Sequence, residues 1–151
     1  MGAILSLQWK DVDFIQGRLT WRQEADKINH EHTTPLTEAA SAILKEARQV
    51  TQGIGKSPVI PAPRDSAKAV SRHLARDWMQ RAQMAAGFTP ESGRGWHAFR
   101  RKFASELCDA GLRVICDLGG WKEPMTVVKC YQHTTEEEMR VGQSKRKLLK
   151  G

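Results

Sequence analysis

The segment His97-Ala98-Phe99-Arg100-Arg101 combines one imidazole with two guanidinium groups. Its spacing predicts a helix whose apolar stripe faces the core and consists of Phe99, Phe103 and Leu107. On this helix His97, Arg100 and Arg101 gather near the N-terminus on an exposed side. Free N–H groups and the helix dipole already favour anions there, so the cluster suits a phosphate. A histidine and an arginine at this spacing are, by themselves, more typical of a solvated basic face.

The chain contains a single tyrosine, Tyr131. A phenol can attack phosphorus when its proton is taken up and the charge on the phosphorane oxygens is neutralised. Taken alone, a tyrosine is more often a half-buried aromatic with a hydrated hydroxyl. The residues before it favour the chemical interpretation: Leu118-Gly119-Gly120-Trp121-Lys122-Glu123-Pro124.

Four motifs follow one another along the chain: Leu7-Gln8-Trp9-Lys10-Asp11-Val12-Asp13, His97-Ala98-Phe99-Arg100-Arg101, Gly119-Gly120-Trp121 and Tyr131-Gln132-His133. In order and spacing they resemble L-x-W-x-D-[IV]-D, H-x-L-R-R, G-G-W and Y-x-H of the tyrosine recombinases, the family of phage integrases. Lys27, eight residues before Pro35, stands where that family keeps a catalytic lysine in a hairpin loop. The resemblance covers residues 2 to about 139 and implies the integrase catalytic-domain fold.

The resemblance also implies a reaction at DNA and a role for each of five side chains. Tyr131 is expected to attack a phosphodiester, leaving a 3′-phosphotyrosyl link and a free 5′-hydroxyl. Arg100 is expected to hold the non-bridging oxygens, and Lys27 to protonate the departing 5′-oxygen. His97 assists at the phosphate or accepts the proton of the tyrosine. Trp121 replaces the more frequent histidine and keeps one N–H donor. The implied chemistry needs no metal and no cofactor.

One residue of the family pattern has no counterpart. An arginine in R-x-G-E-[IL] precedes L-x-W, and aligning Gly2 and Ala3 with the glycine and glutamate places it one position before Met1. The family's core-binding domain has no counterpart either, so residues 1–151 are expected to form one catalytic domain truncated at its N-terminus. Loss of one donor to transition-state charge costs on the order of 10²- to 10³-fold in rate. We therefore expect the isolated chain to bind DNA weakly and to cleave it poorly or not at all.

Three functions remain open at this point. The first is a site-specific DNA recombinase or integrase, with double-stranded DNA and other protomers of the same recombinase as partners. The second is a type IB topoisomerase, which shares the chemistry but relaxes DNA without exchanging strands between partners. The third is a catalytically inactive DNA-binding remnant of an integrase. Lys27, H-x-x-R and G-G-W in so short a domain favour the first, and the missing arginine supports the third.

Composition agrees with a cytoplasmic DNA-binding protein. The formal net charge is +7 at pH 7, which attracts polyanions at low salt. No apolar run approaches the roughly 18 residues of a membrane span, and the N-terminus lacks the pattern of a secretion signal. Cys108, Cys116 and Cys130 are odd in number and form no C-x-x-C pair, so we expect reduced, mostly buried thiols. His30 and His32 share one expected strand face but lack a third ligand, so no metal site is predicted.

The elements expected to position these residues make a mainly helical α+β domain. Alternating apolar residues on both sides of Gln16-Gly17 predict a β-hairpin, and a third strand is expected over 30–36. This small antiparallel sheet is expected to pack on a helical bundle. Thr37 is the predicted N-cap of the next helix.

The later segments are predicted from glycine, proline and capping residues. Gly53 to Arg64 is expected to be a loop, and Ser66 is expected to cap a second long helix. A short helix is predicted from Leu112 to Leu118. Another begins at Pro124 and carries Tyr131, and a last helix is predicted from Glu136 to about Leu149.

Overall fold

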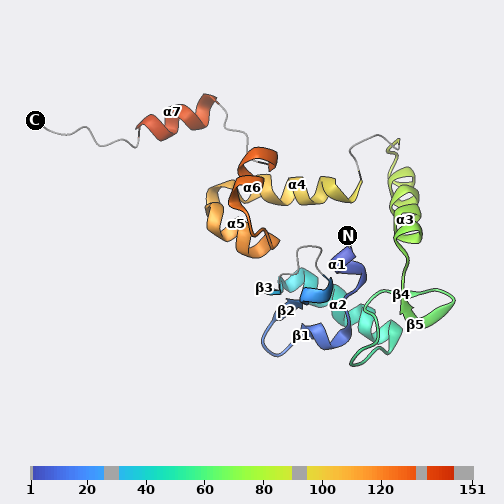
Figure 1. Cartoon of the computed structure of the whole chain (residues 1–151). Coiled ribbons are helices and arrows are strands. Elements are labelled where there is room, and N and C mark those ends of the chain that lie inside the picture. Colours follow the sequence, from blue (N-terminus) through green and yellow to red (C-terminus); the bar gives the residue numbers. More distant parts are fainter. Residues whose placement is uncertain (1, 26–30, 90–94, 132–135, 145–151) are drawn as a thin grey trace, which may run out of the picture.

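A computed structural model of the protein describes residues 2–25, 31–89, 95–131 and 136–144. Within these ranges, only the backbone is described for four residues: Ala25, Cys130, Tyr131 and Glu138. The described parts form a mainly helical α+β structure with two small antiparallel sheets in its first half (Figure 1). This confirms the fold class predicted from the sequence.

The first sheet has three strands in the order β1 (Val12–Asp13), β2 (Arg18–Trp21) and β3 (His32–Pro35). All neighbours are antiparallel, and Trp21 lies directly opposite His32. Gly17 turns the chain between β1 and β2 with a φ of +61°, a conformation that glycine adopts without strain. The predicted hairpin and third strand are confirmed, although the strands are short.

The sheet shares its core with α2 (Glu38–Thr51), which follows it, whereas α1 (Gly2–Leu5), which leads into it, buries Leu5 in a separate cluster. The buried residues of this core are Leu7, Trp9, Val12, Leu19 and Val59, and Leu44 and Ala47 of α2 pack against them. The hydroxyl of Thr37 accepts a hydrogen bond from the Ala40 amide at 3.2 Å, which confirms the predicted N-cap. Hydrophobic burial therefore fixes α2 beside the sheet.

The segment after α2 differs from the prediction. The strands β4 (Pro61–Ala62) and β5 (Asp65–Ala69) pair there as a two-stranded sheet. The loop that was predicted up to Arg64 therefore contains a strand, β4. Ser66 lies in β5 and caps no helix. The next helix, α3 (Arg72–Ala85), is capped by Ser71, whose hydroxyl accepts from the Leu74 amide at 3.2 Å.

Packing explains why α3 begins at this later serine. Leu5, Val70 and Ala75 form a small buried cluster, against which Leu74 and Trp96 pack. A helix that started at Ser66 would change the chain direction before Val70 reaches this cluster. Tertiary burial thus decides between two serines with equal intrinsic capping ability.

The helical half contains α4 (Trp96–Glu106), α5 (Leu112–Gly119), α6 (Pro124–Tyr131) and α7 (Glu136–Ser144). A short 3₁₀ turn, Cys108–Ala110, joins α4 to α5. Helices α4, α5 and α6 meet in a core of Ala104, Ile115, Cys116 and Val127. In Figure 1, α7 lies apart from this group, at the end of the chain. The predicted helices at Leu112 and Pro124 are confirmed.

The inner face of α4 differs from the predicted one. Phe99 has 59% of its surface exposed, so the prediction that it is buried with Phe103 and Leu107 is wrong. Ala104 is fully buried and forms the centre of the inner face, and Arg100, four residues earlier, lies half-buried on the same face. Phe99 lies on the flank and contacts Trp96, with ring centroids 6.1 Å apart.

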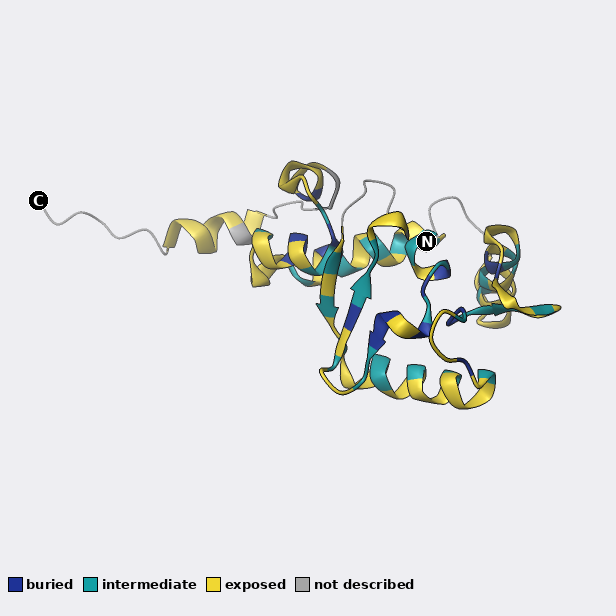
Figure 2. Cartoon of the chain, turned by 60° about the horizontal axis from the view of Figure 1, so that its bottom comes forward, coloured by how far each residue is buried: buried dark blue, intermediate teal, exposed yellow. Residues whose placement is uncertain are grey.

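The two halves meet where β3 lies against α5. Figure 2 shows α2 beside one end of the strands and the group α4–α6 beside the other end. None of the helices in the described ranges has the length and apolar character needed to cross a membrane.

Candidate active site

Arg100 is a predicted site residue that two contacts hold in place. Its Nη2 donates a hydrogen bond to the carbonyl oxygen of Gly119 at 3.0 Å. Its guanidinium carbon lies 3.7 Å from the centroid of the Trp121 ring, which is close cation–π contact. These two contacts join α4 to the last residue of α5 and to the segment after it, and they fix the plane of the guanidinium group. Such a planar, oriented donor is suited to bind a phosphate through two parallel hydrogen bonds.

Trp121 is held in place by its own backbone and by a second ring. Its amide donates to the carbonyl oxygen of Cys116 at 3.0 Å, and its ring stacks on Phe103 with centroids 6.3 Å apart. The indole also folds back over Gly119, where a Cβ atom would overlap the ring. The first glycine of the G-G-W motif is therefore needed for the close approach of the tryptophan that ends it.

His97 lies in the first turn of α4, three residues before Arg100, and its side chain is exposed. This spacing makes the two residues neighbours along the helix, but they differ in exposure. Arg101 is exposed as well, whereas Arg100 turns inward onto Trp121. The predicted cluster is therefore split, because Arg100 leaves the exposed side expected for it.

Tyr131 is the last residue of α6, and its side chain is not among those described. The helix that carries it is fixed by Val127, which is fully buried among Ala104, Ile115 and Cys116. Lys27 lies outside the described residues, as does His30. The strands on either side of Lys27 are described, and they end and begin at Trp21 and His32.

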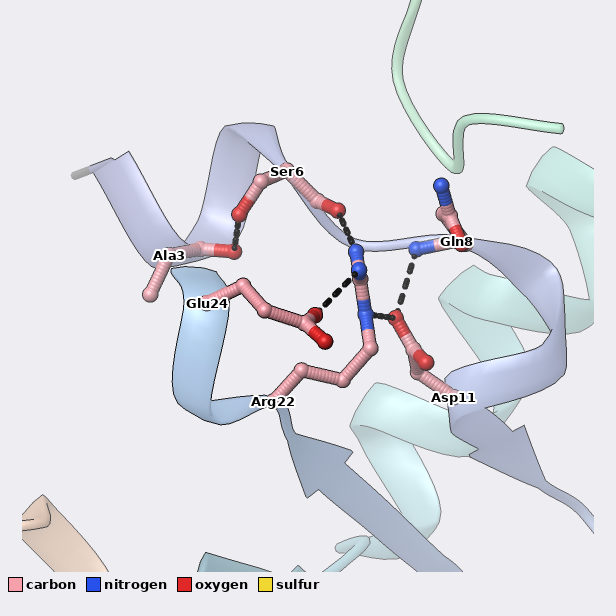
Figure 3. Close-up of polar contacts among 6 residues, drawn as sticks. All are labelled: Ala3, Ser6, Gln8, Asp11, Arg22 and Glu24. Carbon is pink, nitrogen blue, oxygen red and sulfur yellow. Dashed lines mark hydrogen bonds and ion pairs between the residues drawn. The ribbon is translucent and has the colours of Figure 1, made fainter. Parts of the chain in front are cut away.

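The end of β2 is held by an ion pair that the sequence did not predict (Figure 3). Arg22 follows β2, and its Nε lies 2.9 Å from Oδ2 of Asp11, a carboxylate with only 5% of the residue exposed. Its Nη2 donates to the Ser6 carbonyl oxygen at 2.6 Å, and the Gln8 amide donates to the same Asp11 oxygen at 2.9 Å. Asp11 of the L-x-W-x-D motif thus anchors Arg22, the residue that follows β2.

A half-open groove of about 630 Å³ lies between β3 and the segment after α5. Its lining includes aromatic rings, cations and carboxylates, among them His32, Arg113, Asp117, Trp121 and Lys122. The buried Cys116 thiol also lines it, and burial raises the pKa of this thiol. Within the described ranges, no group of three or more metal-binding side chains occurs.

His32 is the site residue that sequence reasoning missed, because it was considered there only as a metal ligand. Its ring stacks on Trp21, with centroids 6.0 Å apart and planes inclined by 20°. The signal was present in the pairing of β2 with β3, which places Trp21 and His32 opposite each other. What the pairing did not show is that the His32 ring lies against Gly120.

The arrangement has the integrase catalytic fold, and solved structures of recombinases and of a transposon integrase match it. XerA recombinase matches with a TM-score of 0.74 at 16% identity, over 97% of this chain and 53% of that one. The Tn1549 transposon integrase in complex with a circular intermediate DNA matches with 0.71 at 13% identity, over 95% and 53%. XerH site-specific recombinase bound to its difH substrate matches with 0.71 at 18% identity, over 93% and 41%.

Residues 1–138 match the phage integrase family, so the chain belongs to that family, the tyrosine recombinases. It has the fold of their catalytic domain. The sequence matches no curated protein. The chain spans about half the length of XerA and of the Tn1549 integrase. At these identities the structural matches show the fold, and the roles of individual residues rest on the chemistry of the site.

Proposed function

We propose that the chain is the strand-transfer module of a site-specific DNA recombinase, with Tyr131 as its nucleophile. The observation that carries the proposal is the fixed Arg100 guanidinium, held 3.0 Å from the Gly119 carbonyl oxygen and 3.7 Å from the Trp121 ring. A guanidinium fixed in this way needs no further ordering when negative charge develops on a phosphorane. Family membership supplies the class of substrate, which is DNA.

In the proposed reaction the Tyr131 oxygen attacks the phosphorus of a DNA phosphodiester. The new bond joins the phenolic oxygen to phosphorus, and the bond from phosphorus to the 5′-oxygen breaks. The phenol proton passes to a base, for which exposed His97 is the candidate. Lys27 donates a proton to the departing 5′-oxygen, while Arg100 neutralises charge on the non-bridging oxygens.

The covalent step conserves the energy of the phosphodiester, so a second 5′-hydroxyl can reverse it and join a new strand. The proposed cleavage and rejoining steps therefore require neither hydrolysis nor a nucleotide cofactor. Trp121 contributes one indole N–H and a rigid surface for Arg100, and it cannot carry a proton between groups as a histidine does. We therefore assign proton transfer to His97 and Lys27.

The partners proposed for the chain are double-stranded DNA and further copies of the same recombinase, in the cytoplasm. The net charge of +7 supports binding to the phosphate backbone. The matching Tn1549 integrase and XerH structures are complexes with DNA. Exchange between two DNA partners needs one nucleophile for each strand that is cut, which calls for more than one protomer.

A nicked suicide DNA tests the proposal, because cleavage next to the nick releases a short fragment and traps the covalent intermediate. The chain is assayed as it stands and in a version extended so that an arginine directly precedes Met1. We expect an adduct on a denaturing gel in the extended version, a weaker one in the shorter version, and none after Tyr131→Phe. DNA binding without an adduct in either version would overturn the proposal and leave a DNA-binding module.

A further inference from the structure

His32 lies at the junction between the sheet and the helical half. It begins β3, pairs with Trp21 of β2 and stacks on that ring in nearly parallel geometry. Its Nδ1 atom is buried, so the ring is enclosed at this edge. β3 is also the strand that lies against α5, the helix that ends in the G-G-W motif.

The other side of the imidazole meets Gly120. A Cβ atom on Gly120 would lie 2.6 Å from Nε2 and 3.2 Å from Nδ1 of His32, so the ring occupies the space that a side chain would need. Gly120 is buried and closes α5 with a φ of +65°. Glycine is therefore required here for two separate reasons, its backbone conformation and the ring against it.

This contact leads directly to the catalytic arginine. Gly120 precedes Trp121, whose ring lies over Gly119 and supports the Arg100 guanidinium at 3.7 Å. A shift of Gly120 therefore moves the surface on which Arg100 rests. His32 also begins β3, the strand that follows the segment containing Lys27 in the sequence.

We propose that His32 is a positioning residue, whose ring is wedged between Trp21 and Gly120 and sets the place of Trp121 and, through it, of Arg100. Its effect on DNA cleavage rests on the proposed function above. Removing the ring leaves a cavity that Gly120 and Trp121 can enter. A misplacement of about 1 Å at a reacting group costs on the order of 10²-fold in rate.

The first measurement needs no DNA. The Nε–H resonance of Arg100, assigned by its loss in Arg100→Lys, is expected upfield in the unaltered chain because the guanidinium lies over the Trp121 ring. In His32→Ala it moves towards the position of an ordinary arginine, and in His32→Phe, which keeps a ring against Trp21, it stays upfield. His73→Ala, at an exposed histidine of α3, is the control and leaves the resonance in place. An unchanged resonance in His32→Ala overturns the proposal.

A double-mutant cycle tests the contact itself and works even if single variants are much less stable. Gly120→Ala places a methyl group against the His32 ring, and His32→Ala removes that ring. We expect Gly120→Ala to destabilise the chain clearly less in the His32→Ala background than alone, as measured by urea unfolding. Equal destabilisation by Gly120→Ala in the unaltered chain and in the His32→Ala variant contradicts the contact between His32 and Gly120.

Cleavage of the suicide DNA is the last readout. At saturating DNA, His32→Ala is expected to slow adduct formation about 10- to 100-fold, with unchanged DNA affinity, and His32→Phe is expected to restore most of the rate. Equal adduct rates in His32→Ala and the unaltered chain overturn the proposal. If the unaltered chain forms no adduct at all, the proposed function fails, while the resonance and the double-mutant cycle still decide the role of His32.

Discussion

Arg100→Lys separates the charge of Arg100 from its geometry. Lysine keeps one positive charge but lacks the planar fork, so it loses both the hydrogen bond to the Gly119 carbonyl oxygen at 3.0 Å and the stack on Trp121 at 3.7 Å. In the transition state an oriented donor is lost while overall attraction to DNA is preserved. Removal of one such donor typically lowers the rate by about 10²- to 10³-fold, or about 2.7–4 kcal/mol.

The assay is single-turnover cleavage of the suicide DNA with protein in excess over a range of concentrations. We expect the maximal rate to fall by two to three orders of magnitude, with a midpoint in protein concentration close to that of the unaltered chain. Arg76→Lys, at an exposed position of α3, is the matched control and is expected to stay within about twofold. A full maximal rate in Arg100→Lys, or an equal loss in both variants, would refute the reasoning.

Three further outcomes are expected. Arg22→Ala leaves the Asp11 carboxylate buried without its cation. Urea unfolding should show a free energy of unfolding that is lower by about 3 kcal/mol, and a loss below about 1 kcal/mol contradicts the buried ion pair. Lys27→Ala should slow cleavage of ordinary DNA. It should slow cleavage much less when sulfur replaces the 5′-bridging oxygen of the DNA, because a thiolate leaves without protonation. Equal slowing on both substrates argues against Lys27 as a general acid. Because burial raises the pKa of Cys116 and keeps its thiol protonated, a maleimide at neutral pH should modify exposed Cys108 and spare Cys116 in the folded chain, as read by peptide mapping.

The motifs of the sequence predicted the family and the fold because they combine chemistry with local structure. G-G-W, for example, requires a helix end and a close ring approach, and both are present at Gly119 and Gly120. Thr37 was predicted as a cap from a local signal, and local hydrogen bonding is enough to establish it. Apart from the sheet formed by β4 and β5, the order of elements along the chain could be read in the same way.

What could not be predicted depends on contacts between distant segments. The rotation of α4 is set by Arg100, whose charge is satisfied by Trp121 and a backbone carbonyl, so a cation lies on the face where Phe99 was expected. The strand Asp65–Ala69 contains no β-branched or aromatic residue and forms through its pairing with Pro61–Ala62. Local patterns carry no signal for either outcome.

His32 and Arg22 were missed for a similar reason. Each acts through a partner that is remote in sequence, Gly120 for the histidine and Asp11 for the arginine. A single sequence shows the residue types but not which of them meet. The candidate site was therefore predicted as a set of chemical groups, and the structure adds the residues that hold Arg100 and the end of β2 in place.

The central claim is that Tyr131 forms the covalent bond to DNA. The most direct measurement is mass spectrometry of the trapped protein–DNA adduct after digestion by protease and nuclease. We expect a peptide carrying a nucleotide 3′-phosphate on Tyr131, and no such peptide from Tyr131→Phe. A nucleotide attached to any other residue, or an adduct that persists in Tyr131→Phe, would contradict the account.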